Sequence, residues 1–232
     1  MTSLDRSLIN ALPIFSAMGA AELDEVLSHA KAQRIPKGDV VFQQGEIAKS
    51  FFALLHGRLK VVKVTPHGKQ VLIRFVNPGD IYGIAKALRR ADYPATATAI
   101  VDSVTLVWPN EIWDEFMAAH PSLAANLMEM MGERLQEAHT RVKELSTEEV
   151  EHRVAHTLLR LVEKSGRATE EGTLIDFPIT QQDIAQASGT TLHSVSRILS
   201  VWESAGLVAV GRRKIVVCDI TGLSQVAEHH SP

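Results

Sequence analysis

The stretch ITQQDIAQASGTTLHSVSRILSVWESAG, residues 179–206, predicts two short helices joined by a tight turn. Thr180 is a residue type that caps helix starts, so the first helix is expected to begin at Gln181. Gly189 can adopt the left-handed conformation that ends a helix. The other constrained positions are small or apolar: Ile184, Ala185, Val195 and Ile198. This is the spacing of a helix-turn-helix, in which the second helix enters the DNA major groove.

The second helix is divided between an apolar and a polar face. Its apolar residues repeat every three or four positions and form one stripe: Val195, Ile198, Leu199 and Trp202. Its polar residues crowd the other side near the helix start: His193, Ser194, Ser196 and Arg197. An ordinary surface helix would show the same division. The cap and turn signals before it favour a recognition helix whose polar residues face bases and phosphates.

A basic hairpin is expected after Gly206, where LVAVGRRKIVVCDI reads as strand, turn, strand. Its turn residues suit phosphate contacts, although a solvated hairpin tip would also favour charged residues. The predicted DNA-binding residues of the helices and the turn are Thr180, Gln181, Thr191, His193, Ser194, Ser196, Arg197, Arg212, Arg213 and Lys214.

Length and charge set limits on the class of protein. With 232 residues, 45% hydrophobic and 22% charged, the chain has room for about two globular domains. Residues 147–232 carry 8 basic and 11 acidic side chains, which accounts for the whole net charge of −3. This opposes nucleic-acid binding, yet half of those bases lie in the predicted recognition helix and hairpin turn. A locally basic face and salt-sensitive DNA binding are therefore expected.

The chain offers neither a membrane span nor a disulfide. It contains no run of about 18 apolar residues. The N-terminal SLINALPIFSAMGA is interrupted by Asn10 and Pro13, so we expect a cytoplasmic protein rather than a secreted one. The single cysteine, Cys218, excludes an intrachain disulfide. A buried, inert thiol is expected there, with a redox switch as the alternative.

Residues 34–109 alternate between short apolar runs and turn signals, which is typical of a β-roll or jelly roll. TPHGKQ is a predicted hairpin turn, and NPGD a sharp turn in which Gly79 takes a positive φ. A cupin-like barrel enzyme would need histidines and carboxylates clustered on neighbouring strands. Only His56 and His67 occur here, so we expect no catalytic site and no metal site.

A long helix is predicted from Pro121 to about residue 145. Its apolar residues form a narrow seam: Leu123, Leu127, Met131, Leu135, Ala138, Val142 and Leu145. The seam favours a homodimer, which would place two recognition helices about 34 Å apart, and the alternative is packing on the chain's own β-domain. Met128 and Met130 are assigned to the same seam. Thr147 is expected to cap the next helix, and GRATEEGTLIDFPI to form a linker or a small hairpin.

These elements define an α+β chain. Residues 1–120 form a β-roll sensor domain with flanking helices, residues 121–146 a dimerisation helix, and residues 147–232 a winged helix-turn-helix domain. This order, with KGDVVFQQGEIAKSFFALLHGRLKVVK and GRRKIVVCDITGL, resembles the Crp/Fnr superfamily of bacterial transcription regulators. The resemblance implies double-stranded DNA, a second copy of the chain and RNA polymerase as partners.

The resemblance also assigns roles in the recognition helix. His193, Ser196 and Arg197 occupy the positions where many members use Glu, Ser and Arg to read a TTG-type half-site. Arg197 can grip guanine bidentately, and the Ser196 hydroxyl can contact a base edge or a phosphate. His193 cannot accept a hydrogen bond from cytosine as a carboxylate does, so the half-site can differ from that of Glu-bearing relatives.

The resemblance places an effector pocket in the β-roll, at Gly83, Ile84, Ala85, Tyr93, Pro94, Ala95 and Thr96. Cyclic-nucleotide-binding relatives have Glu where Ile84 stands, and Arg where Pro94 or Ala95 stands, so no cyclic nucleotide is expected. Oxygen-sensing relatives use four cysteines, so no iron–sulfur cluster is expected. GIAKAL, YPATATAIVDS and TLHSVSRILSVWE are similar to nitric-oxide-responsive denitrification regulators, which implies haem as a candidate cofactor without defining its ligand. The alternative is control without an effector, or through Cys218.

Overall fold

The computed structural model describes residues 9, 12–16 and 18–228. It divides into two compact units, one of residues 1–69 and 73–136 and the other of residues 70–72 and 137–232, here called the N-terminal and C-terminal units. The division falls within one long helix, α4 (Pro121–Thr147), whose predicted start at Pro121 is confirmed. None of the described helices is long and apolar enough to cross a membrane.

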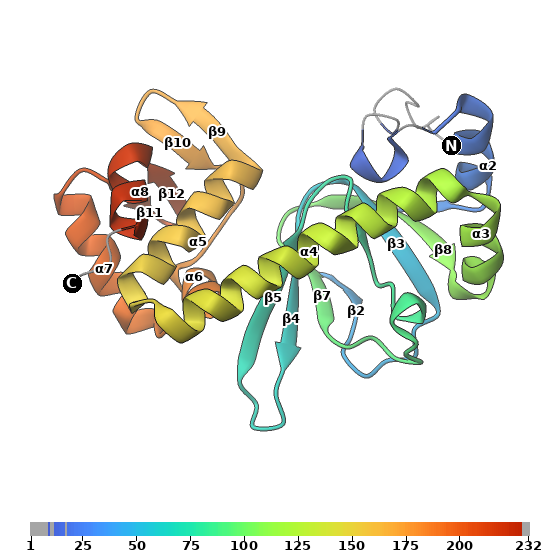
Figure 1. The fold of residues 1–232 in the computed structure, drawn as a ribbon, viewed down its shortest axis with the longest axis horizontal. Helices are drawn as coiled ribbons and strands as arrows, with labels where there is room; N and C mark the ends of the chain where they lie inside the picture. The colour runs from blue at the N-terminus through green and yellow to red at the C-terminus, as the bar shows by residue number, and fades with distance from the viewer. Residues whose placement is uncertain (1–8, 10–11, 17, 229–232) are drawn as a thin grey trace. The chain divides into compact units, whose positions relative to one another are not determined.

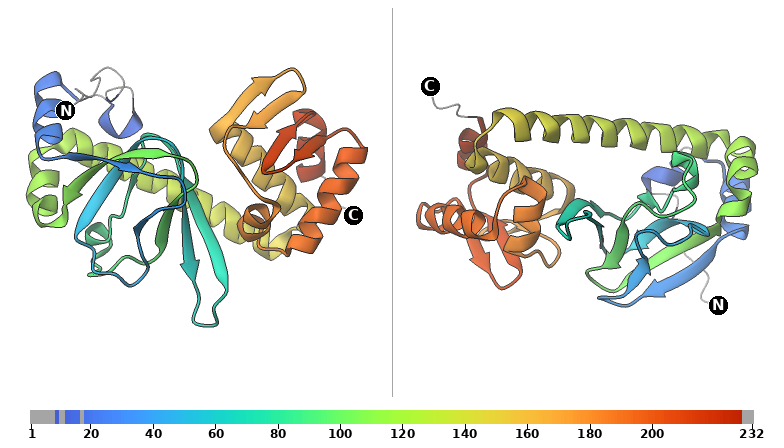
Figure 2. Two further views of the ribbon diagram at one scale, coloured as in Figure 1. Left: turned by 180° about the vertical axis from the view of Figure 1, so that it is seen from behind. Right: turned by 90° about the horizontal axis from the view of Figure 1, so that it is seen from below.

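Two antiparallel four-stranded sheets form the predicted β-roll (Figure 1). The first has the order β1-β8-β3-β6, with β1 (Lys31–Ile35), β8 (Ser103–Pro109), β3 (Ser50–His56) and β6 (Ile81–Tyr82). The second has the order β2-β7-β4-β5, with β2 (Val40–Phe42), β7 (Thr96–Ala99), β4 (Leu59–Val64) and β5 (Gln70–Val76). Non-consecutive neighbours in both sheets show that the chain crosses between them, as in a jelly roll. Figure 2 shows both sheets from two further sides.

The two predicted turns lie where the sequence places them. Residues 65–69 connect β4 to β5, and Gly79 has φ +89°. A Cβ atom on Gly79 would lie 2.4 Å from Cδ of Pro13, so close packing as well as backbone conformation requires glycine there.

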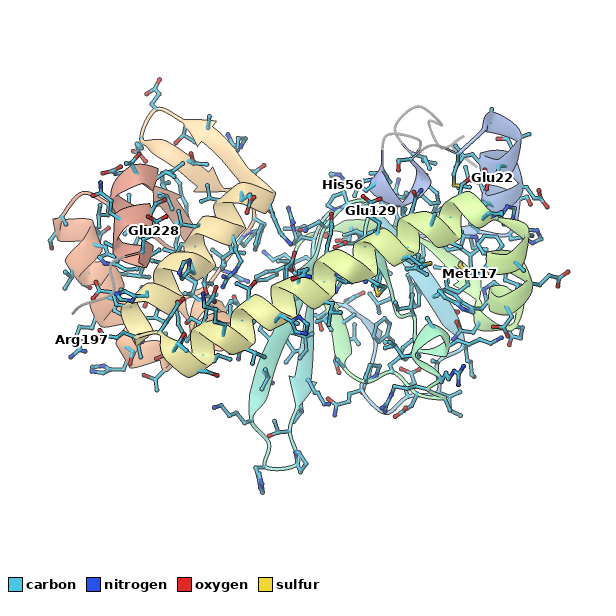
Figure 3. All side chains as sticks on the ribbon, in the orientation of Figure 1. Glu22, His56, Met117, Glu129, Arg197 and Glu228 are labelled. Atoms are coloured by element: carbon cyan, nitrogen blue, oxygen red, sulfur yellow. The ribbon has the colours of Figure 1, made fainter. Side chains whose placement is uncertain are left out.

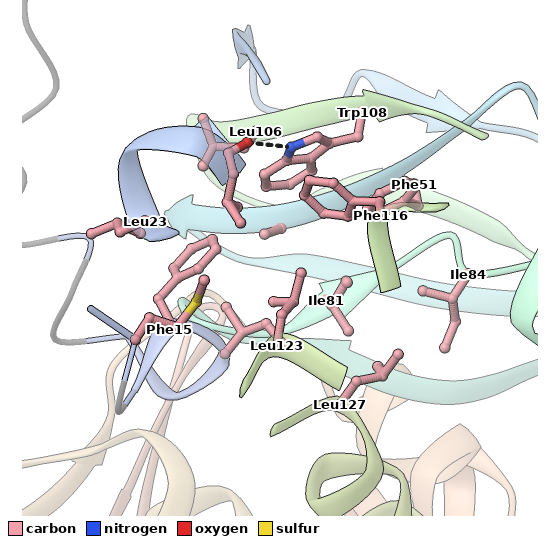
Figure 4. Packing of buried hydrophobic residues seen from close by; sticks show 14 of the residues in the cluster. Phe15, Leu23, Phe51, Ile81, Ile84, Leu106, Trp108, Phe116, Leu123 and Leu127 are labelled. Atoms are coloured by element: carbon pink, nitrogen blue, oxygen red, sulfur yellow. Dashed lines mark hydrogen bonds between the residues drawn. The ribbon is translucent and has the colours of Figure 1, made fainter. Parts of the chain in front are cut away.

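The larger core of the N-terminal unit lies between the first sheet and the helices beside it (Figure 4). These helices are η1 (Pro13–Phe15), α2 (Ala20–Ser28), η3 (Asn110–Ile112), α3 (Trp113–Ala119) and the first half of α4. Trp108 is buried among Phe15, Phe51 and Phe116, and its Nε1 donates to the carbonyl of Val26 at 2.9 Å. A buried indole N–H is therefore satisfied inside the apolar cluster.

The predicted seam of α4 is divided in the structure. Leu123 and Leu127 are buried in the core of their own unit, 2% and 8% exposed. Met130 packs in the same core, so the assignment of Leu123, Leu127 and Met130 to a dimer seam is wrong. Leu135 and Val142, in contrast, are 56% and 63% exposed. One apolar repeat thus serves two environments, a core for Leu123 and Leu127 and an exposed surface for Leu135 and Val142.

The C-terminal unit combines helices with a small four-stranded sheet of order β11-β12-β10-β9. Its elements after α4 are α5 (Val150–Ser165), β9 (Gly166–Thr169), β10 (Gly172–Ile175), α6 (Gln181–Ser188), α7 (Leu192–Ser204), β11 (Val208–Gly211), β12 (Lys214–Val217) and α8 (Ile220–Glu228). Helix α5 packs against α6, α7 and α8. Of the two alternatives left open for residues 166–179, the hairpin is confirmed, formed by β9 and β10.

Thr147 does not cap α5, so that prediction is wrong. It is the last residue of α4, and its hydroxyl donates to the carbonyl of Lys143 at 2.9 Å. Glu149 occupies the N-cap position of α5 without a side-chain hydrogen bond. The hydroxyl bonds backwards along α4, a local alternative that Ser and Thr side chains often take in helices.

Candidate nucleic-acid interface

Helix α6 begins at Gln181, as predicted, and its start is fixed by a capping box. The Thr180 hydroxyl oxygen accepts from the backbone N–H of Asp183 at 3.1 Å, and the Asp183 carboxylate accepts from the backbone N–H of Thr180 at 3.0 Å. The two bonds satisfy N–H groups that have no partner inside the helix. The Thr180 hydroxyl also donates to Asp183 at 2.6 Å, so the fold itself engages this predicted DNA-binding side chain.

The end of α6 is held by arginines of two other helices. Gly189 has the predicted left-handed conformation, with φ +66°. Arg141 on α4 donates to the carbonyl of Ala187 at 2.8 Å, and Arg153 on α5 donates to the carbonyl of Ser188 at 3.0 Å. A Cβ atom on Gly189 would lie 2.5 Å from Leu145. The turn before α7 is thus fixed both by charged donors on its terminal carbonyls and by close packing.

The apolar stripe of α7 faces the core of the C-terminal unit, as the sequence predicts. Val195, Leu199 and Trp202 are buried, and Ile198 is half-buried. The Trp202 indole N–H donates to Glu151 on α5 at 2.9 Å. These contacts fix the rotation of α7 about its axis, and so determine which side chains it presents to the outside.

The polar residues at the start of α7 fall into two groups. Thr191 is the N-cap, and its hydroxyl oxygen accepts from the backbone N–H of Ser194 at 3.1 Å, while the two hydroxyl oxygens lie 3.0 Å apart. His193 and Arg197 are exposed one helical turn apart, and Ser196 is half-buried. Figure 3 shows the Arg197 side chain on the outside of the C-terminal unit. The structure therefore presents His193 and Arg197 outward while Thr191 and Ser194 serve the cap.

The predicted basic hairpin is present. Strands β11 and β12 pair, with Arg212 and Arg213 exposed between them. Arg213 has φ +59°, in the left-handed region that residues with a Cβ atom disfavour. Its carbonyl accepts from the backbone N–H of Ile179 at 3.2 Å, which ties the hairpin turn to the residue just before the α6 cap. Lys214 Nζ lies 4.0 Å from the Glu171 carboxylate, which offsets part of its charge.

Three of the seven predicted effector-pocket residues belong to two different apolar clusters. Ile84 packs in the larger core, whereas Ala85 and Tyr93 pack in a second cluster inside the β-roll. A Cβ atom on Gly83 would lie 2.7 Å from Phe52. Pro94 and Thr96 are half-buried and Ala95 is buried. The structure thus brings Gly83, Ala85 and Tyr93 to the same aromatic cluster and places Ile84 elsewhere.

Aromatic rings fill that second cluster. The Tyr93 ring stacks on Phe42 with centroids 3.9 Å apart, and the Tyr82 ring lies 5.1 Å from Phe52. The Tyr82 hydroxyl donates to Thr105 at 2.9 Å, and the Tyr93 hydroxyl donates to the carbonyl of Ser50 at 2.8 Å. Burial raises the pKa of both tyrosines, so both rings stay neutral at ordinary pH.

Cys218 is the other chemical group that the sequence singles out. Cys218 is exposed just after β12, so the prediction of a buried thiol is wrong. Partial desolvation and the Glu171 carboxylate raise the pKa of this thiol, which disfavours the reactive thiolate. His152 is buried, and His156 Nε2 lies 3.4 Å from Glu148. Among the described residues no group of three or more His, Cys, Asp or Glu side chains could hold a metal ion.

Leu192 is an exposed apolar residue beside the predicted reading residues that the sequence prediction of the interface omits. It is the first residue of α7 and lies between the cap Thr191 and the exposed His193. The available signal was its position, since Leu192 follows the stripe spacing but stands at the first residue of α7, where the helix begins and fewer neighbours cover it.

Comparison with known proteins gives two family matches. A model of the cyclic nucleotide-binding domain matches residues 32–120, and a model of the Crp-like helix-turn-helix domain matches residues 152–226. The Cyclic AMP receptor protein of Thermus thermophilus is 27% identical over 215 residues, covering 93% of this chain and 96% of that protein. The Fumarate and nitrate reduction regulatory protein of Escherichia coli is 26% identical over 208 residues, covering 90% and 82%.

The fold is shared with solved structures. FixK2 from Bradyrhizobium japonicum superposes with a TM-score of 0.74 at 22% identity, covering 87% of this chain and 99% of that one. A CRP-family transcriptional regulator from Thermus thermophilus gives a TM-score of 0.71 at 25% identity, covering 85% and 97%.

Proposed function

Because the chain belongs to the Crp/Fnr family of transcription regulators, we propose that it binds a two-fold symmetric, TTG-type DNA site as a homodimer through α7. The observation that carries this proposal is the orientation of α7, whose apolar side is buried while His193 and Arg197 are exposed at its N-terminal half. Members of this family regulate transcription and are not enzymes, which sets aside the cupin-like enzyme.

The exposed side chains of α7 supply direct base readout. The Arg197 guanidinium matches the two acceptors that guanine presents in the major groove. Ser196, one residue before it, offers a hydroxyl to a base edge or a phosphate. His193 stands where Glu-bearing relatives accept from cytosine, so its imidazole would read a different base edge or a phosphate at that position.

Positioning contacts come from the hairpin turn and the start of α6. Arg212 and Arg213 are exposed and suit phosphates, and the bond between Arg213 and Ile179 links the turn to the α6 N-terminus. Gln181 is half-buried in the first turn of α6 and would contact a phosphate beside the hairpin turn. Helix N-termini favour anions, so a phosphate at α6 would gain from the helix dipole as well. Binding through several phosphates would weaken steeply with salt.

Homodimerisation is supported by the outer side of α4. Its exposed or half-buried apolar residues repeat at alternating intervals of three and four: Met128, Met131, Leu135, Ala138, Val142 and Leu145. This heptad pattern is typical of a coiled-coil contact between two helices. As a bacterial regulator of this type, the protein would act in the cytoplasm and meet RNA polymerase at its promoters.

Nitric oxide or a related nitrogen oxide is the signal that we propose, on the resemblance of residues 83–88 and 93–103 to nitric-oxide-responsive regulators. The family itself does not select among cyclic nucleotide, haem and iron–sulfur effectors. The seven predicted pocket residues do not fit haem as they stand. They offer no imidazole or thiol, and the hydroxyl of Tyr93 is engaged by Ser50.

A regulator without an effector, or one controlled through Cys218, is the second candidate. The aromatic filling around Tyr93 favours it, because a ligand at that point would require Phe42 or Tyr93 to move. The raised pKa of the Cys218 thiol favours effector independence over redox control.

An anaerobic titration of a fluorescent TTG…CAA palindrome tests both candidates. The protein alone, the protein mixed with haem, and that mixture with nitric oxide are compared, each also on a scrambled duplex. Tighter binding only after nitric oxide supports the signal. Equal, palindrome-specific binding in all three supports the effector-independent regulator, and equal binding to palindrome and scrambled DNA contradicts the proposed function.

A further inference from the structure

The outward side of α7 carries four side chains, here called the α7 patch: Leu192, His193, Ser196 and Arg197. Residues four apart lie one above the other on a helix, so Leu192 stands beside Ser196, and His193 beside Arg197. At about 100° per residue, Leu192 lies about 60° from the buried Val195 and borders the apolar stripe, while His193, Ser196 and Arg197 continue the outer surface away from that stripe. Leu192 thus lies in the same surface as the residues proposed to read bases.

The first turn of α7 offers few polar groups to a base. The hydroxyl oxygens of Thr191 and Ser194 lie 3.0 Å apart, and that of Thr191 also accepts from the N–H of Ser194. Leu192, between them in sequence, is 46% exposed. The exposed side chains of this turn that take no part in the cap are therefore Leu192 and the His193 ring.

An exposed leucine at this place has a specific partner in DNA. Thymine is the only base that presents a methyl group in the major groove, and apolar side chains discriminate it by contact with that methyl. A TTG-type half-site contains two thymines next to the guanine. We propose that Leu192 reads the C5-methyl group of a half-site thymine, an inference that rests on the proposed DNA-binding function.

The same helix contains a matched control. Val201 is also apolar and is 59% exposed, but it lies nine residues further along α7. Nine residues rise about 13.5 Å along the helix, so Val201 lies near the C-terminal end of α7, one turn beyond Arg197 and far from the N-terminal turn that carries Leu192. An effect of surface apolarity alone would appear for both residues, whereas base reading concerns Leu192 only.

The test removes the methyl group from DNA rather than from the protein. Thymines of the palindrome are replaced by 2′-deoxyuridine, one symmetric pair at a time, and affinities are measured for wild type, Leu192→Ala and Val201→Ala. For wild type and Val201→Ala, we expect one replacement to weaken binding about fifteen-fold, or about four-fold per half-site, as for burial of one methyl group. Leu192→Ala should bind the thymine duplex more weakly and lose this sensitivity.

The outcomes separate this inference from the function on which it rests. In one outcome, wild type binds the palindrome specifically and no deoxyuridine replacement weakens the binding. That result would overturn the role of Leu192 and leave the proposed function intact. Deoxyuridine sensitivity that persists in Leu192→Ala would do the same. Wild type that fails to distinguish the palindrome from scrambled DNA would overturn both. Circular dichroism melting of Leu192→Ala controls for folding, and no change is expected because the side chain is half outside the core.

Discussion

The β-roll and the helix-turn-helix place their candidate functional residues in opposite environments. In the β-roll, Ala85 and Tyr93 lie inside an aromatic cluster, so a ligand there depends on space that the interior must provide. In the helix-turn-helix, His193 and Arg197 are exposed and held in place by the buried side of the same helix. A ligand site in the β-roll would require buried side chains to rearrange. The DNA-reading surface is instead already held in place by the buried side of α7.

Removal of the anchor should give the largest effect. Trp202→Ala is expected to lower the free energy of unfolding by about 3–5 kcal/mol, because it empties a buried site and removes the indole partner of Glu151. Urea unfolding followed by circular dichroism measures the loss. Val201→Ala, at the neighbouring exposed position, should stay within about 0.5 kcal/mol of wild type. Equal effects of the two substitutions would contradict the assigned orientation of α7.

Truncation of the recognition side chain should affect binding without affecting stability. Arg197→Ala is expected to cost about 1–3 kcal/mol on the palindrome and much less on scrambled DNA, measured by fluorescence anisotropy. Arg212→Ala is the comparison, since loss of a phosphate contact weakens both duplexes alike and lowers the salt slope by about 1. Equal losses on both duplexes would make Arg197 a phosphate contact as well.

The buried tyrosines should make the β-roll sensitive to alkali. Burial raises the pKa of Tyr82 and Tyr93 in the folded state, whereas an unfolded tyrosine titrates near about 10. The stabilisation by the two neutral tyrosines is therefore fully present below that pH. Above that pH the free energy of unfolding falls by up to about 1.4 kcal/mol per pH unit for each tyrosine. Free energies of unfolding between about pH 9 and 11 test this, with Tyr82→Phe expected to reduce the slope. A flat wild-type profile would contradict neutral, buried hydroxyls.

The smallest expected effect lies in the hairpin turn. Arg213→Gly should raise the free energy of unfolding by about 1 kcal/mol, because glycine adopts φ +59° without strain. The same change should weaken binding to both palindrome and scrambled DNA by removing a phosphate contact. Arg213→Lys keeps the positive charge and a side chain at the left-handed φ, so it serves as the control in thermal melting and in fluorescence anisotropy. A loss of stability in Arg213→Gly would show that the guanidinium supports the fold.

Local signals explain what could be predicted from the sequence. Thr180 and Gly189 fix the two ends of α6 through their own backbone chemistry, and the β-roll turn at Gly79 depends on the same kind of signal. The misassigned residues depend on neighbours distant in sequence. Leu123 and Leu127 fit the apolar repeat of a dimer seam, and only the sheet beside them decides that they are buried.

Single-residue placement was harder to predict than element boundaries. Thr147 could have capped α5, but α4 continues to that residue. Cys218 follows the buried strand β12 by one position and is therefore outside the core that its apolar neighbours suggested. The strained φ of Arg213 has no sequence signal, because arginine does not favour it. The effector pocket is least predictable, because its space depends on how Phe42 and Tyr93 stack.

Sequence-specific binding of symmetric DNA through α7 is tested most directly by one anisotropy titration. Wild type and Arg197→Ala are titrated against the TTG…CAA palindrome and against its scrambled form at two salt concentrations. We predict that wild type binds the palindrome as two chains per duplex, far more tightly than the scrambled form, and that Arg197→Ala loses most of this difference. Equal affinity of wild type for both duplexes at both salt concentrations would contradict the assignment of α7 as a recognition helix.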